Sequence, residues 1–278
     1  MTSCTTNKHL SAQERSPRLS ELEQAQLGQV RYRKNGSPSA HPWPDAHLWP
    51  SVREYLVKRS QVSNPALDER LTAYTPGETL ALLRHPLVAA WHQVALTQLE
   101  HRPAHIVLVG CAKTKPWTGP AARKSKLYSA YNRLRSELPD VHFVTISEPL
   151  GVVPQEHWGD FPQYDNPGLF VDDAQRSGMT TAQWLASPFG RPYGLPFDQE
   201  ARSACLKELG SLIGQFLQAN SYAKFTAFVD ALDGQETTHA VMLDIGARMA
   251  AVPVERHPKL PAPRSSPYEY MLDVLTKP

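Results

Sequence analysis

A short apolar segment that ends in small and cationic residues is the first place where this chain could carry chemistry. Residues 106–110 are apolar and rich in β-branched side chains, which predicts a strand buried on both faces. Cys111, Lys113 and Lys115 follow it directly. In an open α/β sheet, ligands bind beyond the carboxyl end of a central strand, so we expect a site here. Cys111 is either a nucleophile in that site or a packed small residue.

A second predicted strand, residues 141–147, also ends at a residue that could react. Glu148 follows it, and Asp165 lies further along, beside Tyr164, in a Gly- and Pro-rich stretch. Two carboxylates near aromatic rings suit cleavage of an N-glycosidic bond, in which one stabilises the oxocarbenium-like sugar and orients a water. The alternatives are a cap or ion pair for Glu148 and an Asx turn for Asp165.

Cations and aromatic side chains alternate in the loop and helix start between these two strands. They are Lys113, Lys115, Trp117, Arg123, Lys124, Lys126 and Tyr128. This mixture suits a phosphate backbone and a stacked base, although the charged face of a solvated helix has the same composition.

The C-terminal region adds two further candidates for the rim of a site. His257 and Arg264 lie in a proline-rich segment that we predict to be a loop, and Ser266-Pro267 reads as the start of the last helix. The role of His239 is open. The histidines at 41, 47, 85 and 92 lack metal-ligand spacing, so we expect no metal site and no cofactor.

The elements that must position these residues alternate between strand and helix. We predict strands at 105–110, 141–147, 224–229 and 240–243, and helices at 125–138, 198–219 and 267–275. This alternation indicates an α/β fold with three layers, α/β/α, and a mostly parallel central sheet. Residues 148–197 are predicted to be irregular apart from a short helix at 180–186, and a loop of that length usually has a function.

The N-terminal part has a different composition from this α/β core. Residues 1–20 are polar and are predicted to be disordered, and residues 21–104 form a mainly helical extension packed on the domain at 105–278. Within the extension we expect helices near 20–30, 50–61, 76–85 and 87–99, the third of which ends at Pro86.

Composition narrows the class of protein only a little. The net charge of +2 and the pI near 8.4 are compatible with a nucleic-acid partner without requiring one. Three cysteines without metal-type spacing indicate a reducing compartment and no disulfide framework. The first thirty residues contain no apolar signal core and no apolar run approaches membrane-spanning length, so we expect a cytoplasmic protein without a membrane partner.

Several of these residues also match the motifs of a known family. Cys111-x3-Lys115-Pro116-Trp117 and Ser125-x2-Tyr128 resemble the Pro-Cys-x3-Lys-Pro-Tyr-x2-Ser-x2-His signature of the archaeosine synthase core domain. Residues 148–154 and 164–167 are similar to its Glu-Pro-Leu-Gly-x-Val-Pro and Tyr-Asp-x-Pro segments, and residues 265–267 more weakly to its Thr-Ser-Pro. The likeness covers about 105–275 and implies a uracil-DNA glycosylase-like fold that holds an extruded base at the strand ends.

The chain departs from that signature at several positions. Gly110 replaces proline, Trp117 replaces tyrosine, Tyr128 replaces the final histidine, and residues are inserted within 118–124. We find no candidate for the tRNA-binding module of archaeosine synthases. The resemblance therefore favours stand-alone phage-defence DNA glycosylases, which excise hypermodified bases such as glucosylated hydroxymethylcytosine and leave an abasic site.

This reading gives each candidate residue a role. Asp165 or Glu148 is the catalytic carboxylate, and Lys115 is an alternative nucleophile that would add strand cleavage. Substrate binding is assigned to Cys111, Lys113, Trp117, Ser125, Tyr128 and Tyr164, and nucleic-acid binding to Arg123, Lys124, Lys126, His257 and Arg264. The partner is DNA with modified bases, with no obligate protein partner. The alternatives are a transferase that modifies a 7-deazaguanine base in RNA and a non-catalytic binder of modified nucleic acid.

Overall fold

A computed structural model describes the central and C-terminal parts of the chain. The described residues are 57, 61, 67–97, 103–112, 115–123, 125–161, 164, 166, 169, 198–231, 237–260 and 265–277. They form a five-stranded sheet in the order β3-β2-β1-β4-β5. The strands are β1 (His105–Gly110), β2 (Val141–Ser147), β3 (Gly151–Pro154), β4 (Lys224–Asp230) and β5 (Glu255–Pro258). β3 is antiparallel to β2 and all other neighbours are parallel, which confirms the predicted α/β class with a mostly parallel sheet.

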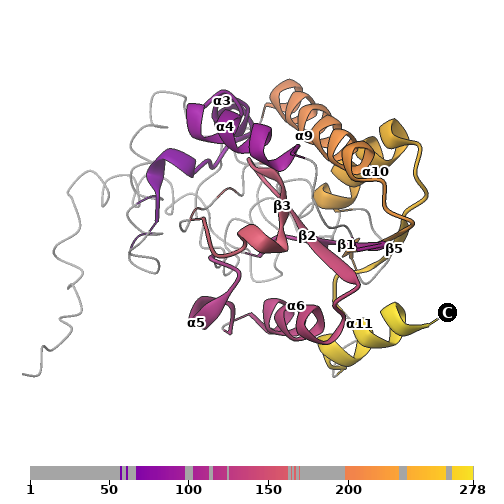
Figure 1. Ribbon diagram of the computed structural model, residues 1–278. Coiled ribbons are helices and arrows are strands. Elements are labelled where there is room, and N and C mark those ends of the chain that lie inside the picture. Colours follow the sequence, from indigo (N-terminus) through magenta and orange to yellow (C-terminus); the bar gives the residue numbers. More distant parts are fainter. Residues whose placement is uncertain are drawn as a thin grey trace, which may run out of the picture.

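Helices cover both faces of this sheet (Figure 1). One layer contains α3 (Pro76–Leu82), α4 (Pro86–Ala95), α9 (Gln199–Asn220) and α10 (Thr238–Ala250). The opposite layer contains α5 (Gly119–Ala122), α6 (Lys126–Glu137) and α11 (Pro267–Thr276). Two short 3-10 turns, η3 (Glu69–Leu71) and η4 (Gln155–His157), complete the described elements. The sheet is thus enclosed between two helical layers, as the alternating sequence pattern predicts.

The two strands that were expected to carry the site form as the sequence indicates. In β1 all residues from Ile106 onward are buried, and β2 is buried along its whole length. Both lie inside the sheet under helices on either face, where a strand needs apolar side chains on both sides. Their carboxyl ends are adjacent, because Gly110 pairs with Ile146 in register.

Side-chain caps set the starts of the predicted helices. Ser125 accepts from Tyr128 N at the start of α6, and Asp198 accepts from Ala201 N at the start of α9. Ser266 does the same for α11, with Pro267 in its first turn. Each cap satisfies a backbone donor that has no partner within its helix, which is why these helices could be located from the sequence.

The predicted strand at 240–243 is wrong, because these residues lie in α10. Thr237 caps this helix by accepting from Ala240 N, and its own hydroxyl donates to Val229 O at 2.6 Å. A short apolar run has no periodicity that separates a strand from a buried helical turn. The strand beside β4 is instead β5, a polar edge strand, so His257 belongs to a strand and not to the predicted loop.

The stretch after β2 is more ordered at its start than we expected. Residues 148–150 form a tight turn into β3, and Gly151 takes up a left-handed conformation with φ of 74°. Glycine adopts this conformation without steric cost, which allows the chain to reverse onto β2. The predicted irregular segment thus begins with a hairpin, and the helix predicted at 180–186 lies outside the described residues.

The described part of the N-terminal region consists mainly of α3 and α4. Pro86 opens α4 instead of only ending the helix before it, and α3 and α4 pack against α9 and β3. Val57 and Gln61 are both helical, within the helix predicted at 50–61, whereas residues 1–20 and the helix predicted at 20–30 lie outside the described residues. Within the described part of the chain, no helix is both long and apolar enough to span a membrane.

The contact between α9 and α10 gives a test of this packing. An alanine Cβ at Gly246 would lie 2.9 Å from both Gly210 O and Gly214 N, which are backbone atoms of α9. We expect Gly246→Ala to lower the free energy of unfolding by about 1–3 kcal/mol in urea titrations, since the two helices must separate. The matched control is Gly77→Ala in α3, where a Cβ meets nothing within 4 Å, and it should stabilise by about 0.5–1 kcal/mol. An unchanged urea midpoint for Gly246→Ala would contradict the close approach of the two helices.

Candidate active site

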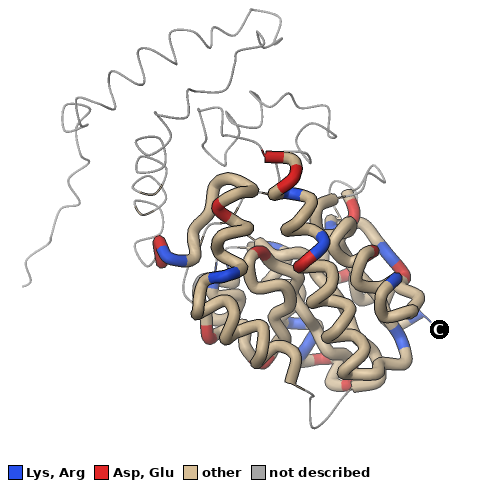
Figure 2. The backbone as a smooth tube through the Cα atoms, turned by 90° about the horizontal axis from the view of Figure 1, so that it is seen from above, with Lys and Arg blue, Asp and Glu red and all other residues tan. Residues whose placement is uncertain are grey.

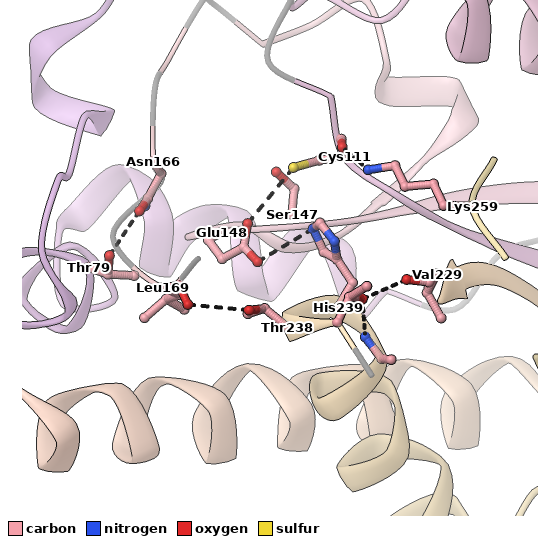
Figure 3. A network of polar contacts seen from close by, with 12 residues as sticks. Thr79, Cys111, Ser147, Glu148, Asn166, Leu169, Val229, Thr238, His239 and Lys259 are labelled. Atoms are coloured by element: carbon pink, nitrogen blue, oxygen red, sulfur yellow. Dashed lines mark hydrogen bonds and ion pairs between the residues drawn. The ribbon is translucent and has the colours of Figure 1, made fainter. Parts of the chain in front are cut away.

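Three reactive side chains from distant segments meet at the carboxyl ends of β1 and β2 (Figure 3). Cys111 follows β1, Glu148 follows β2, and His239 lies in the first turn of α10. The Cys111 thiol points at Glu148 Oε2 at 3.9 Å, and His239 Nε2 lies 3.5 Å from Glu148 Oε1. Glu148 and His239 are buried and Cys111 is half-buried. We call these residues the Cys111–Glu148–His239 cluster.

Backbone pairing places the first two members of the cluster. Cys111 N donates to Ile146 O at 3.0 Å, which extends the β1–β2 ladder by one residue. The turn that carries Glu148 is held by α4, where Trp91 Nε1 donates to Leu150 O at 3.1 Å and His92 Nε2 lies 3.0 Å from Pro149 O. The N-terminal helices thus help to orient the carboxylate.

The position of His239, the third member of the cluster, requires a glycine at the end of β1. A Cβ at Gly110 would lie 2.9 Å from His239 Nδ1 and 3.1 Å from Lys259 Nζ. Glycine therefore allows the imidazole to lie directly against the end of β1. The family signature has proline at this position, and a proline ring would occupy the same space.

Two lysines flank the cluster and affect its protonation. Lys115 is buried, with Nζ 4.0 Å from the centre of the Tyr164 ring and 3.4 Å from Tyr164 O. Lys259 Nζ donates to Cys111 O at 2.7 Å. Burial, followed by the charges of Lys259 and Lys115, lowers the pKa of His239 well below its usual value. The imidazole is therefore neutral at neutral pH.

The pKa of the Cys111 thiol moves in the opposite direction. Burial raises it most, and the nearby Glu148 carboxylate raises it further, while Lys115 and Lys259 partly oppose this shift. The thiol is therefore protonated at neutral pH and is not activated as a nucleophile by its surroundings. It serves as a donor to Glu148.

Buried aromatic side chains contact one another and β2 near the cluster. The Trp117 and Tyr128 rings stack with centres 5.5 Å apart, and both are enclosed by protein. Tyr128 lies with its hydroxyl 3.0 Å from Thr145 Oγ1, and the Tyr164 hydroxyl lies 2.6 Å from Ser147 Oγ. In this structure these rings pack against β2, and their predicted contact with a base stays a prediction.

Described residues after η4 contact elements around the strand ends. The Thr79 hydroxyl of α3 donates to Asn166 Oδ1 at 2.9 Å, and the Thr238 hydroxyl of α10 donates to Leu169 O at 3.3 Å (Figure 3). Together with the Tyr164 contact to β2, these bonds connect the three residues to α3, α10 and the strand that ends at Glu148.

The structure brings several predicted site residues together. Cys111, Lys115, Glu148 and Tyr164 converge around the strand ends, as the argument from strand ends expected. Four predicted residues lie outside the described residues, namely Lys113, Lys124, Asp165 and Arg264. Tyr164 and Asn166, on either side of Asp165, are both buried beside the cluster.

The other predicted residues are distributed around this centre. Ser125 caps α6. Arg123 is exposed directly after α5, and Lys126 is exposed as the first residue of α6. His257 lies on β5, with Nε2 3.1 Å from Glu255 Oε1. Sequence reasoning left His239 without a role and did not mention Lys259. The one signal for His239 was Thr237, a capping residue that would have placed it in the first turn of a helix.

Comparisons with protein-family models, with curated proteins and with solved structures found no match to this chain. The chemistry of the site is therefore inferred from its geometry. A buried carboxylate lies between a thiol and a neutral imidazole, with two ammonium groups beside it. Such a site can orient a water molecule and stabilise charge that develops on a substrate.

Two neighbouring tyrosines of α6 test the polar support of the site. Tyr128 and Tyr131 are both fully buried, but within the described part of the chain only the Tyr128 hydroxyl has a hydrogen-bond partner. We expect Tyr128→Phe to lower the free energy of unfolding by about 1–2 kcal/mol, because it also leaves Thr145 without this partner. Tyr131→Phe should be neutral or stabilising in the same denaturant titration, and the reverse order would contradict the assignment.

Proposed function

We propose that this protein is a DNA glycosylase that flips out and excises a modified base, such as glucosylated hydroxymethylcytosine in phage DNA, and so acts in anti-phage defence. The observation that carries the proposal is Glu148, which is only 1% exposed and lies at the carboxyl end of β2 among Cys111, His239 and Lys115. This is where an open α/β sheet binds its ligand. The motifs shared with the archaeosine synthase core domain and its uracil-DNA glycosylase-like fold support the same reading.

Excision of a base makes two electrostatic demands. The sugar becomes cationic as the N-glycosidic bond breaks, and the departing base becomes negative. In our proposal Glu148 stabilises the sugar and orients the attacking water, while the ammonium group of Lys115 stabilises the departing base. Lys115 is anchored by the Tyr164 carbonyl and ring, which suits a fixed charge better than an attacking amine. Hydrolysis to an abasic site is therefore preferred to strand cleavage.

DNA must be held while the nucleotide is extruded, which costs a few kcal/mol. Basic and acidic positions are mixed along the described chain in Figure 2, so phosphate binding has to be local. Arg123 and Lys126 are exposed in the segment that follows Lys115 and Trp117. They are the described cations that we assign to the phosphates.

The activity can be tested directly on DNA. Full-length protein is incubated with phage DNA that carries glucosylated hydroxymethylcytosine and, in parallel, with the same sequence made of plain cytosine. Alkali-labile sites in the modified DNA alone support the proposal. Binding without such sites indicates a non-catalytic reader, and incorporation of lysine into tRNA indicates the transferase chemistry of the resembled family; either result rejects the glycosylase.

The role of Glu148 predicts a large kinetic effect. Glu148→Gln should lower the rate of base excision by about 10²–10⁴-fold, because the amide neither stabilises the cationic sugar nor accepts a proton from water. The matched control is Asp140→Asn, which should leave the rate unchanged. Asp140 is an exposed carboxylate directly before the first residue of β2, whereas Glu148 follows the last one. Single-turnover kinetics on modified DNA measure both. A wild-type rate for a folded Glu148→Gln protein would rule out this residue as the catalytic carboxylate.

Phosphate binding by the two exposed cations predicts a change in salt dependence. In the double variant Arg123→Ala and Lys126→Ala, the slope of log affinity against log salt should become shallower by about 0.9 for each phosphate that the protein no longer neutralises. Lys224→Ala is the control, since Lys224 is exposed at the start of β4, opposite the carboxyl ends of the parallel strands. DNA-binding titrations at several salt concentrations give the slopes. Equal slopes for the double variant and the wild type would mean that other residues bind the phosphates.

A further inference from the structure

The Cys111–Glu148–His239 cluster combines three donor types that seldom meet by chance: a thiol, a carboxylate and an imidazole. One ligand atom from each lies within 4.8 Å of the other two. The residues come from the ends of two strands and the start of a helix, each held by its own backbone contacts. No loop has to fold over for the three groups to meet.

Their separations are close to those in a tetrahedral zinc site. Zinc binds nitrogen and oxygen at about 2.0–2.2 Å and sulfur at about 2.3 Å, which places neighbouring tetrahedral ligands about 3.3–3.6 Å apart. The carboxylate oxygens lie 3.5 Å from His239 Nε2 and 3.9 Å from the Cys111 sulfur. All three ligand atoms lie within 4.8 Å of one another, so small side-chain movements would bring them around a single ion.

We propose that Cys111, Glu148 and His239 bind one divalent zinc-class ion at the carboxyl ends of β1 and β2. Thiolate and imidazole together select borderline soft metals such as Zn²⁺ over Mg²⁺ or Ca²⁺, which prefer oxygen ligands alone. Three protein ligands leave a fourth position open, the arrangement of catalytic zinc sites rather than structural ones.

The charges of the site are compatible with a bound cation. A thiolate and a carboxylate together neutralise Zn²⁺, so Lys115 and Lys259 face a neutral centre and are not repelled by it. A neutral imidazole can offer a lone pair to the ion without adding charge. The thiol must lose its proton on binding, which the metal itself promotes.

A nucleophilic role for Cys111 is the competing explanation of the same cluster. That role needs a base that takes the thiol proton, but the Glu148 carboxylate, 3.9 Å from the sulfur, is a much weaker base than a thiolate. The neutral imidazole contacts the carboxylate on its other side. A metal, by contrast, uses all three groups at once.

This inference does not rest on the proposed function. If an ion were bound, Glu148 would be one of its ligands, and the ion would supply the polarisation of a water that the proposed function assigns to the carboxylate. Metal binding is measured without DNA, so the two proposals can fail separately. If the protein binds zinc but excises no base, only the proposed function is rejected. If it excises bases but binds no metal, only this inference is rejected.

The test uses the full-length protein and two metals. Protein purified without chelators is analysed for metal content, stripped, and titrated with Co²⁺ and then with Zn²⁺. We expect one equivalent of Co²⁺, a thiolate-to-cobalt charge-transfer band in the near ultraviolet, displacement by Zn²⁺, and a higher melting temperature with metal. Failure of the wild-type protein to show the charge-transfer band overturns the proposal.

Single-residue variants identify which side chains bind the metal. Cys111→Ser should remove the charge-transfer band, whereas Cys205→Ser should keep it, because Cys205 is a buried thiol that contacts Pro76 O in a helix interface. His239→Gln should weaken Zn²⁺ binding by more than the roughly 10–100-fold that removal of a hydrogen bond to a metal ligand costs. Circular dichroism checks that each variant is folded. A cobalt spectrum that survives Cys111→Ser, or zinc affinity unchanged in His239→Gln, overturns the assignment.

Discussion

The compensation of one buried negative charge is the constraint on which this structure depends. Glu148 is almost fully buried, and an isolated carboxylate in such a position would cost several kcal/mol in lost hydration. The protein surrounds it with a thiol donor, an imidazole and the ammonium groups of Lys115 and Lys259. Well-packed apolar residues in place of buried ionic groups are often neutral or stabilising, so stability alone does not require a carboxylate at this position.

Each layer of the fold contributes to that compensation. The sheet brings Cys111 beside Glu148 through the parallel pairing of β1 and β2. The N-terminal helices hold the turn that carries the carboxylate, through Trp91 and His92. The C-terminal half supplies His239 from α10 and Lys259 from the segment after β5. The site is therefore a property of the whole described fold, and not of one loop.

The proposed function and the proposed metal site use the same edge of the sheet in different ways. The first needs an ionised carboxylate beside cations that accommodate a departing anionic base. The second needs a thiolate, a carboxylate and a neutral imidazole whose charges balance a divalent ion. Both are served by a site whose carboxylate and imidazole are buried, since exclusion of water strengthens every electrostatic interaction within it.

The sequence by itself determined what depends on local chemistry. Several features could be predicted because their causes lie within a few residues. They are the apolar strands β1 and β2, the position of Glu148 at a strand end, and the helix caps Ser125, Asp198 and Ser266. Tertiary structure decided the rest. Polar β5 joins the sheet and His239 lies against Gly110 because of partners far away along the chain. A pattern of neighbouring residues does not identify such partners, because they are determined by how distant segments pack in the folded protein.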